Sequence, residues 1–124
     1  TPLMVLFQSF AFKDGIPLDA DLVFDARCLP NPHYDAQMKA LSGRDAAVIQ
    51  YLESFDSVRE MIDDIAGYLQ KWLPRHAEEH RSYLTVAIGC TGGQHRSVYL
   101  VERLAAHFAP RWTTVRRHRE LENR

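Results

Sequence analysis

The fold follows from residues 83–97, which read Tyr83-Leu84-Thr85-Val86-Ala87-Ile88-Gly89-Cys90-Thr91-Gly92-Gly93-Gln94-His95-Arg96-Ser97. The first seven residues form a nearly continuous apolar run, which is typical of a strand covered on both faces. After the two glycines, apolar side chains recur at three- and four-residue steps as far as Phe108, and Pro110 follows. The stretch therefore predicts a central strand, a glycine loop and a helix in succession.

Three further strands are expected around this unit. Residues 3–12 are rich in aromatic and β-favouring side chains and run into a turn at 13–17. Residues 22–27 form a second short strand, cut off by Pro30-Asn31-Pro32, and residues 113–116 have the pattern of a last, edge strand. Proline removes a ladder donor, so neither proline can continue a strand.

Two helices are expected between the second strand and the central one. Residues 45–52 fit a short helix, and a longer one begins at Ser57, where Ser57 and Glu60 have the spacing of a capping box. Its apolar side chains recur at helical steps, and Pro74 is expected to end it. Strands alternating with helices predict a single α/β domain over residues 1–124, with a mixed or mostly parallel sheet and helices packed on it.

The charge and the cysteine content exclude several classes of protein. The formal net charge of -1 excludes a uniformly basic surface, so nucleic-acid binding would need a local patch. Cys28 and Cys90 lie too far apart for a paired zinc site and are too few for a disulfide scaffold, which favours a reducing, cytoplasmic setting. We expect no metal, no cofactor and no membrane span, and the start at Thr1 suggests a piece of a longer protein.

The glycine loop has the chemistry of an anion site. A buried strand that leads through glycines into a helix brings backbone N–H groups and the positive end of the helix dipole together. Gly92 and Gly93 permit close approach of a ligand, and the loop also carries His95. The hydroxyls of Thr91 and Ser97 and the guanidinium of Arg96 complete a predicted phosphate-binding set. The alternative is a strand-to-helix turn whose glycines only save space.

The same loop has a second interpretation. Cys90 and Arg96 stand at the Cys-x5-Arg spacing of protein tyrosine phosphatases, in which a thiolate attacks phosphorus and the arginine holds the phosphoryl oxygens. A helix N-terminus and a nearby arginine would lower the pKa of such a cysteine. Against this interpretation, Gly89 precedes the cysteine where many such enzymes have histidine, and no general acid can be assigned.

Two other clusters carry candidate binding chemistry. The run Arg116-Arg117-His118-Arg119 is suited to contacting RNA phosphates, although a solvated terminal strand would look the same. His76-Ala77-Glu78-Glu79-His80 fits an inverted zinc-protease pattern. We reject a zinc site there, because the cluster is expected in a hydrophilic connector after Pro74 and no third ligand is evident.

Five blocks of the sequence, in order and spacing, resemble the C-terminal domain of the RapZ family. They are residues 9–17, 19–27, 29–33, 81–99 and 117–119, which together span nearly the whole chain. Gln94 departs from the family pattern, which often has lysine there. In the family this domain follows a P-loop kinase-like domain that this sequence does not contain.

The resemblance implies an RNase adapter that binds a small regulatory RNA, presents it to RNase E and senses glucosamine-6-phosphate. By the same resemblance, His33, Thr91, Gly92 and Arg96 would hold the sugar phosphate, while Lys13 and the arginines near the C-terminus would contact RNA. The leading hypothesis is thus a non-catalytic sensor and RNA-binding module, expected as a homodimer. A Cys90-dependent phosphatase and a purely structural dimerisation domain remain as alternatives.

Overall fold

A four-stranded parallel sheet forms the framework of the domain in the computed structural model, which describes residues 2–122. The strand order is β2-β3-β1-β4, and each neighbouring pair runs parallel. The strands are β1 (Met4–Ala11), β2 (Leu22–Asp25), β3 (Tyr83–Cys90) and β4 (Thr113–His118). The predicted α/β class is confirmed, as are the central place of β3 and the edge place of β4.

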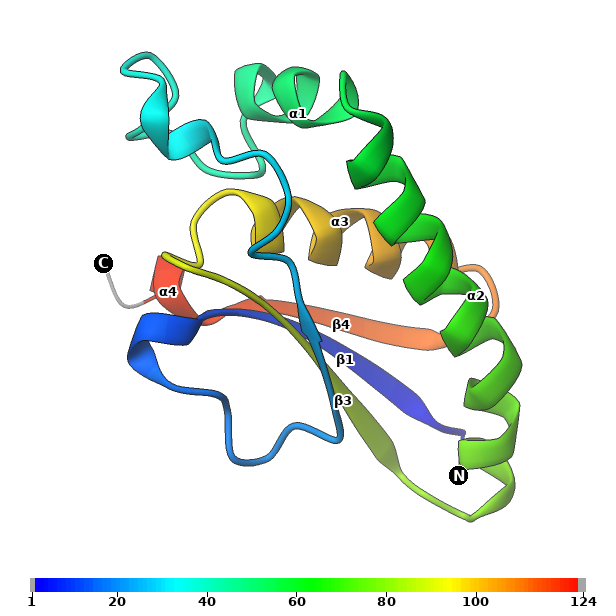
Figure 1. The fold of residues 1–124 in the computed structure, drawn as a ribbon. Coiled ribbons are helices and arrows are strands. Elements are labelled where there is room, and N and C mark those ends of the chain that lie inside the picture. The colour runs from blue at the N-terminus through cyan, green and yellow to red at the C-terminus, as the bar shows by residue number, and fades with distance from the viewer. Residues whose placement is uncertain (1, 123–124) are drawn as a thin grey trace.

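Three helices lie on one side of this sheet (Figure 1). They are α1 (Ala46–Glu53), α2 (Asp56–Glu78) and α3 (Arg96–Phe108). Shorter helical turns are η1 (Phe12–Asp14), η2 (Pro32–Tyr34) and α4 (Arg119–Glu122). Among residues 2–122, no helix combines the length and apolar composition needed to cross a membrane.

The core lies between the sheet and these helices. Alternate residues of each strand face the helices, so Val5 and Phe7 of β1 align with Leu84 and Val86 of β3, and all four are fully buried. The helices close the core with apolar stripes at three- and four-residue steps. The buried apolar side chains of α2 and α3 are Val58, Ile62, Ile65, Ala66, Leu69, Leu73, Val98, Tyr99, Leu100, Val101, Leu104, Ala105 and Phe108.

Segment 12–21 covers part of the opposite face, where it passes beneath β3 (Figure 1). Phe10 and Phe12 crowd Gly89, where an added Cβ would lie 2.4 Å from Phe10 Cζ. Asp21 accepts a hydrogen bond from the backbone N–H of Thr85 at 2.8 Å. These contacts explain why β3 is buried on both faces although the helices lie on only one.

The prediction that Pro74 ends the second long helix is wrong. The helix α2 continues through Pro74 to Glu78. Proline costs a helix one backbone hydrogen bond, but Leu73 is fully buried and Ala77 packs against the core one turn beyond. Burial of the helix face on both sides of the proline therefore outweighs the local penalty.

Two expectations tied to this helix also need correction. The capping box at Ser57 and Glu60 is not formed, because α2 begins at Asp56 with Phe55 as its N-cap and no side-chain capping bond. The Phe55 ring packs on Tyr51 with 5.1 Å between centroids, so an aromatic contact sets the entry into the helix. His76 lies inside α2 rather than in a connector.

Candidate functional site

A cavity of about 280 Å³ opens at the carboxyl ends of β1 and β3, beside the start of α3. This volume lies near the lower end of small-molecule pockets, roughly 300 Å³. Parallel strands end at the same edge, so the topology brings the loops after both strands to one place. The lining residues are Lys13, Asn31, His33, Tyr34, Cys90, Thr91, Gly92, Gln94, His95 and Arg96.

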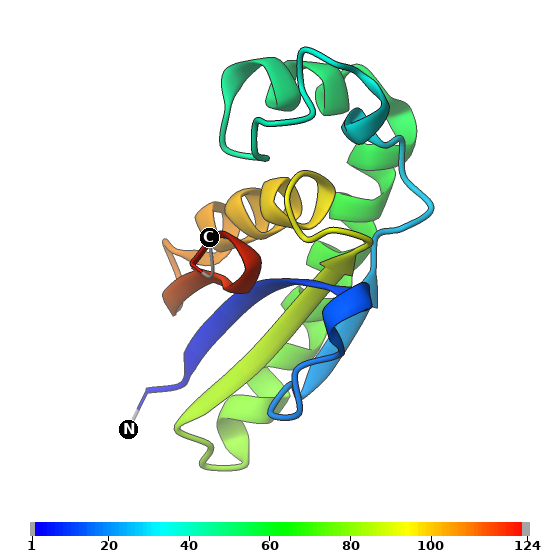
Figure 2. The ribbon, with the colours of Figure 1, turned by 90° about the vertical axis from the view of Figure 1, so that its left-hand side faces the viewer.

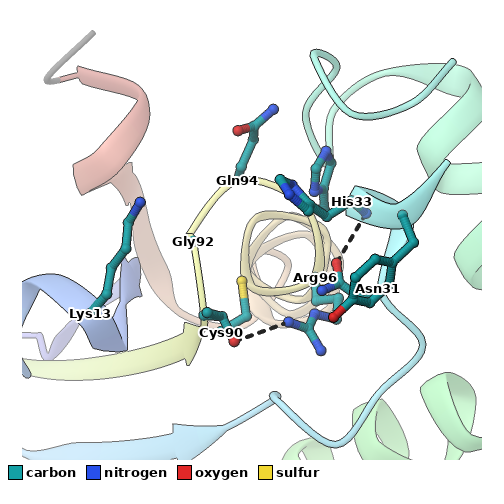
Figure 3. Close-up of a pocket in the computed structure, with 10 residues that line it drawn as sticks. Lys13, Asn31, His33, Cys90, Gly92, Gln94 and Arg96 are labelled. Atoms are coloured by element: carbon teal, nitrogen blue, oxygen red, sulfur yellow. Dashed lines mark hydrogen bonds between the residues drawn. The ribbon is translucent and has the colours of Figure 1, made fainter. Parts of the chain in front are cut away.

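The glycine loop forms one wall of this cavity (Figure 3). Gly92 is exposed and no atom lies within 4 Å of the position of a Cβ, so its backbone is open to a ligand. Gly93 lies beneath with φ of 66°, a conformation that favours glycine. The helix α3 then begins with His95 as an N-cap that makes no side-chain capping bond, which leaves the positive helix end facing the loop.

Arg96 is buried, with only 4% of its surface exposed. Its Nη1 donates to the carbonyls of Arg27 at 2.8 Å and Leu29 at 2.9 Å. The side chain thus ties the segment after β2 to the loop after β3. Its Nη2 makes only a long contact of 3.5 Å to Thr91 Oγ1, and its Nε has no hydrogen-bond partner among the described residues.

The opposite wall comes from η2 and its flanks. The Asn31 side chain accepts a hydrogen bond from the His33 backbone N–H at 3.0 Å, which begins the turn. Both His33 and Tyr34 are exposed, Tyr34 to 86%. Figure 3 shows His33 and Asn31 on one side of the glycine loop and Lys13 on the other.

Segment 35–45 is held to the glycine loop by hydrogen bonds. The buried ring of His95 donates its Nε2–H to the Met38 carbonyl at 3.0 Å, and Gln94 Nε2 donates to the carbonyls of Lys39 and Leu41. Burial lowers the pKa of His95, which opposes protonation of this anchor. Gly43 packs so closely that an added Cβ would lie 2.3 Å from the His95 carbonyl oxygen. The neutral ring of His95 therefore holds segment 35–45 against the glycine loop.

Cys90 and Ser97 are joined at the base of the loop. Cys90 Sγ lies 3.1 Å from Ser97 Oγ and accepts a longer, 3.5 Å hydrogen bond from the Ser97 backbone N–H. Cys90 lines the cavity although only 2% of its surface is exposed, whereas Ser97 is fully buried below it. Ser97 and Gly93 thus support the loop from beneath rather than line the cavity.

The basic run near the C-terminus is divided between two faces of β4. Register places Arg116 beside Phe7 and Arg117 beside Gln8, so their side chains point in opposite directions. Arg116 forms an ion pair of 2.6 Å with Glu102. Among the described residues, neither Arg117 nor Lys13 has an ion-pair or hydrogen-bond partner for its side chain, so both are available to a ligand.

His118 is buried in a network that connects β1, β4 and α3. Its Nε2 donates to Glu102 at 2.6 Å, and its Nδ1 lies 2.7 Å from Ser9 Oγ. Burial alone would raise the pKa of Glu102, but bonds from His118 and Arg116 outweigh burial and hold this pKa below its ordinary value. The set has the composition of a serine triad, yet Ser9 is completely buried. A substrate cannot reach it, so the network is structural.

The predicted set and the observed site overlap in part. The structure brings His33, Thr91, Gly92, His95 and Arg96 to one cavity, and their roles in binding stay predictions. Sequence reasoning assigned Lys13 only to RNA and missed Asn31 and Tyr34 as lining residues. The nearness of Asn31 and Tyr34 to His33 in the sequence was the available signal.

Comparison with known proteins identifies relatives over nearly the whole chain. The chain is 62% identical to a nucleotide-binding protein of Paracidovorax citrulli over 122 residues, which is 98% of this chain and 42% of that protein. It is 60% identical to a nucleotide-binding protein of Chromohalobacter salexigens over 96% of this chain and 40% of that protein. The chain therefore spans about two fifths of the length of these curated relatives.

A match to a protein family covers the residues that build the cavity. The profile of the RapZ C-terminal domain matches residues 3–122 and so includes η2, the glycine loop and β4. The match extends through all four strands, which excludes a likeness limited to the loop. On this match, together with relatives about 60% identical over almost all of its length, the chain belongs to the RapZ C-terminal domain family.

Proposed function

We propose that this domain is a non-catalytic sensor that binds a phosphorylated amino sugar, glucosamine-6-phosphate, in the cavity beside the glycine loop. The observation that carries the proposal is the buried guanidinium of Arg96 at the cavity. Its Nη2 makes only a long hydrogen bond, and its Nε has no partner among the described residues. An unpaired buried cation is costly, and a phosphoryl group would supply its missing partner. The Nη2 of Arg96, held only by its long contact to Thr91 Oγ1, is the donor that a phosphoryl oxygen could take over, whereas the Nε is shielded from solvent.

The other lining residues fit the remaining chemistry of such a ligand. Lys13 adds positive charge on one side, and the open backbone at Gly92 with the N-terminus of α3 adds N–H donors. Asn31 and His33 on the facing wall supply polar groups for sugar hydroxyls. The names of the relatives mention nucleotide binding, and a nucleotide carries the same phosphoryl group.

Calorimetric titration of the domain with glucosamine-6-phosphate tests the sensor. We expect saturable binding tighter than that of inorganic phosphate or glucosamine alone, because only the sugar phosphate reaches both walls of the cavity. Cys90→Ser should bind with an unchanged Kd, since a hydroxyl can replace the thiol beside Ser97. Binding no stronger than that of inorganic phosphate would contradict the assignment of the sugar.

The phosphatase is the second candidate, favoured by one specific contact. The Cys90 thiol lies 3.1 Å from Ser97 Oγ, where the serine hydroxyl could stabilise a thiolate. Against it, Arg96 Nη1 is committed to two backbone carbonyls. Assay of the same titration mixture for released phosphate distinguishes the two functions. Steady release by wild type that Cys90→Ser abolishes would replace the sensor with an enzyme.

We further propose that the domain binds a small regulatory RNA and serves its presentation to RNase E, as part of a longer, homodimeric protein. In this proposal Arg117 carries the RNA contact and Lys13 serves either the RNA or the sugar phosphate, because both side chains lack partners among the described residues. Arg116 is exposed on the other face of β4, where it pairs with Glu102, while His118 and Arg119 are held by internal hydrogen bonds. Contacts of this kind bind phosphates without reading bases.

Substitution of Arg117 tests the RNA surface. Arg117→Ala should weaken binding of a stem-loop RNA and reduce the slope of log K against log salt by about 1, the contribution of one phosphate contact. Arg59→Ala is the control, because Arg59 is also an exposed arginine and lies on α2, where it pairs with Asp56. Equal salt slopes for wild type and Arg117→Ala would remove Arg117 from the interface.

A further inference from the structure

The C-terminal helix α4 lies against two parts of the candidate site. It follows β4 directly and packs at the carboxyl end of β1, close to η1 and the glycine loop (Figure 2). Its first two residues, Arg119 and Glu120, pair with each other at 2.7 Å. Neither residue lines the cavity, so any effect they have on a ligand must act through the backbone that they hold.

Glu120 contacts the glycine loop from below. Its Oε2 accepts a hydrogen bond from the Ala11 backbone N–H at 2.9 Å, which fixes the side chain to the end of β1. Its Cγ occupies the space where a Cβ on Gly93 would lie, only 2.5 Å away. The Glu120 side chain therefore packs directly on the backbone of Gly93, and only 14% of that side chain is exposed.

Arg119 spans the turn that carries Lys13. Its Nη2 donates to the Gly15 carbonyl at 2.9 Å and to the Ala11 carbonyl at 3.3 Å, one on each side of η1. Its guanidinium also lies 5.7 Å from the centre of the Phe10 ring. Because both ends of η1 are held by one side chain, the direction of Lys13 toward the cavity depends on Arg119.

We propose that Arg119 and Glu120 are positioning residues for the anion cavity: Glu120 holds the glycine loop, and Arg119 holds the turn that presents Lys13. This inference rests on the proposed function of the cavity. It assigns Arg119 to the support of a ligand site, in place of the direct RNA contact expected from the sequence. A ligand then meets a loop and a lysine that are already in place, which reduces the ordering cost of binding.

Substitution of Glu120 separates positioning from stability. We expect Glu120→Ala to weaken binding of glucosamine-6-phosphate roughly tenfold, the loss that follows when a loop must be ordered on binding. Glu120→Gln keeps an oxygen acceptor for the Ala11 N–H and should restore part of the affinity. In the ligand-free protein, ¹⁵N relaxation should show greater mobility of residues 91–94 in Glu120→Ala than in wild type.

The matched control is Glu53→Ala. Glu53 also accepts from an arginine, Arg103 at 3.0 Å, and from the Tyr99 hydroxyl at 2.8 Å, but it does not line this cavity. This variant should lower thermal stability and leave both the Kd and the mobility of residues 91–94 unchanged. A loss of affinity in Glu120→Ala that Glu53→Ala does not show is therefore not the general effect of removing a glutamate that pairs with an arginine.

Each outcome decides one proposal. If wild type and Glu120→Ala bind glucosamine-6-phosphate equally, the positioning role is overturned and the proposed sensor stands. If wild type does not bind this ligand, the sensor fails, and relaxation decides the rest: equal mobility of residues 91–94 in both proteins would overturn the role of Glu120. Substitution of Arg119 is tested in the same way. Arg119→Lys should weaken binding of glucosamine-6-phosphate, whereas Arg111→Ala should not, because Arg111 is an exposed arginine beyond α3. Equal affinities of wild type and Arg119→Lys would overturn the role of Arg119.

Discussion

Gly93→Ala should lower the free energy of unfolding by about 3 kcal/mol, through steric overlap and an unfavourable backbone conformation together. Gly93 has φ of 66°, and an added Cβ would lie 2.5 Å from Glu120 Cγ, 2.8 Å from Ala11 N and 2.9 Å from Phe10 C. Two of these atoms belong to the backbone of the central strand β1 and cannot move aside. Urea denaturation followed by circular dichroism measures the loss.

The neighbouring glycine is the matched control for this substitution. At Gly92 no atom lies within 4 Å of the position of a Cβ, so Gly92→Ala should change the free energy of unfolding by less than about 1 kcal/mol. Equal denaturation midpoints for Gly93→Ala and Gly92→Ala would mean that the loop does not pack on α4 as described. Such a result would also remove the contact on which the positioning role of Glu120 depends.

Arg96→Ala should have the largest effect on ligand binding. We expect the Kd for glucosamine-6-phosphate to rise by roughly thirtyfold, or about 2 kcal/mol, because hydrogen bonds to a charged group are lost. Stability should fall as well, since the carbonyls of Arg27 and Leu29 lose their donor. Calorimetry gives the Kd, and thermal denaturation gives the change in stability.

Two variants show which property of Arg96 matters. Arg96→Lys keeps the charge but not the planar fork, so it should bind almost as weakly as Arg96→Ala. Arg27→Ala removes a nearby exposed guanidinium while leaving the Arg27 carbonyl that Arg96 contacts, and it should bind like wild type. Wild-type affinity in Arg96→Ala would show that this guanidinium does not hold the ligand, and the sensor would then need another anion clamp.

Local features of the sequence were sufficient for most of the secondary structure. The apolar run before Gly89, the paired glycines and the helical spacing after Ser97 each act over a few residues, and together they predicted β3, the loop and α3. The period of two in strands and the steps of three and four in helices are set by backbone geometry alone. The errors came where tertiary burial overrode a local preference, as at Pro74 and at the start of α2.

The partners of the charged side chains could not be predicted in the same way. The basic run near the C-terminus suggested one RNA surface, but strand register sends Arg116 and Arg117 to opposite faces, and His118 bonds Ser9 across 109 residues. Such pairings depend on which strands become neighbours, and no local pattern encodes them. The same holds for Lys13, which the parallel order of β1 and β3 brings to the cavity.

The sequence by itself thus determined the α/β class, the strand-loop-helix unit and the expectation of an anion at the glycine loop, because periodicity, glycine conformation and helix polarity are properties of short segments. Only the tertiary structure decided that Arg96 ties two loops together, and that Arg119 and Glu120 lie beneath the site. The physical reason is distance along the chain. These contacts join residues 67 to 109 positions apart, and they exist only once the sheet has formed.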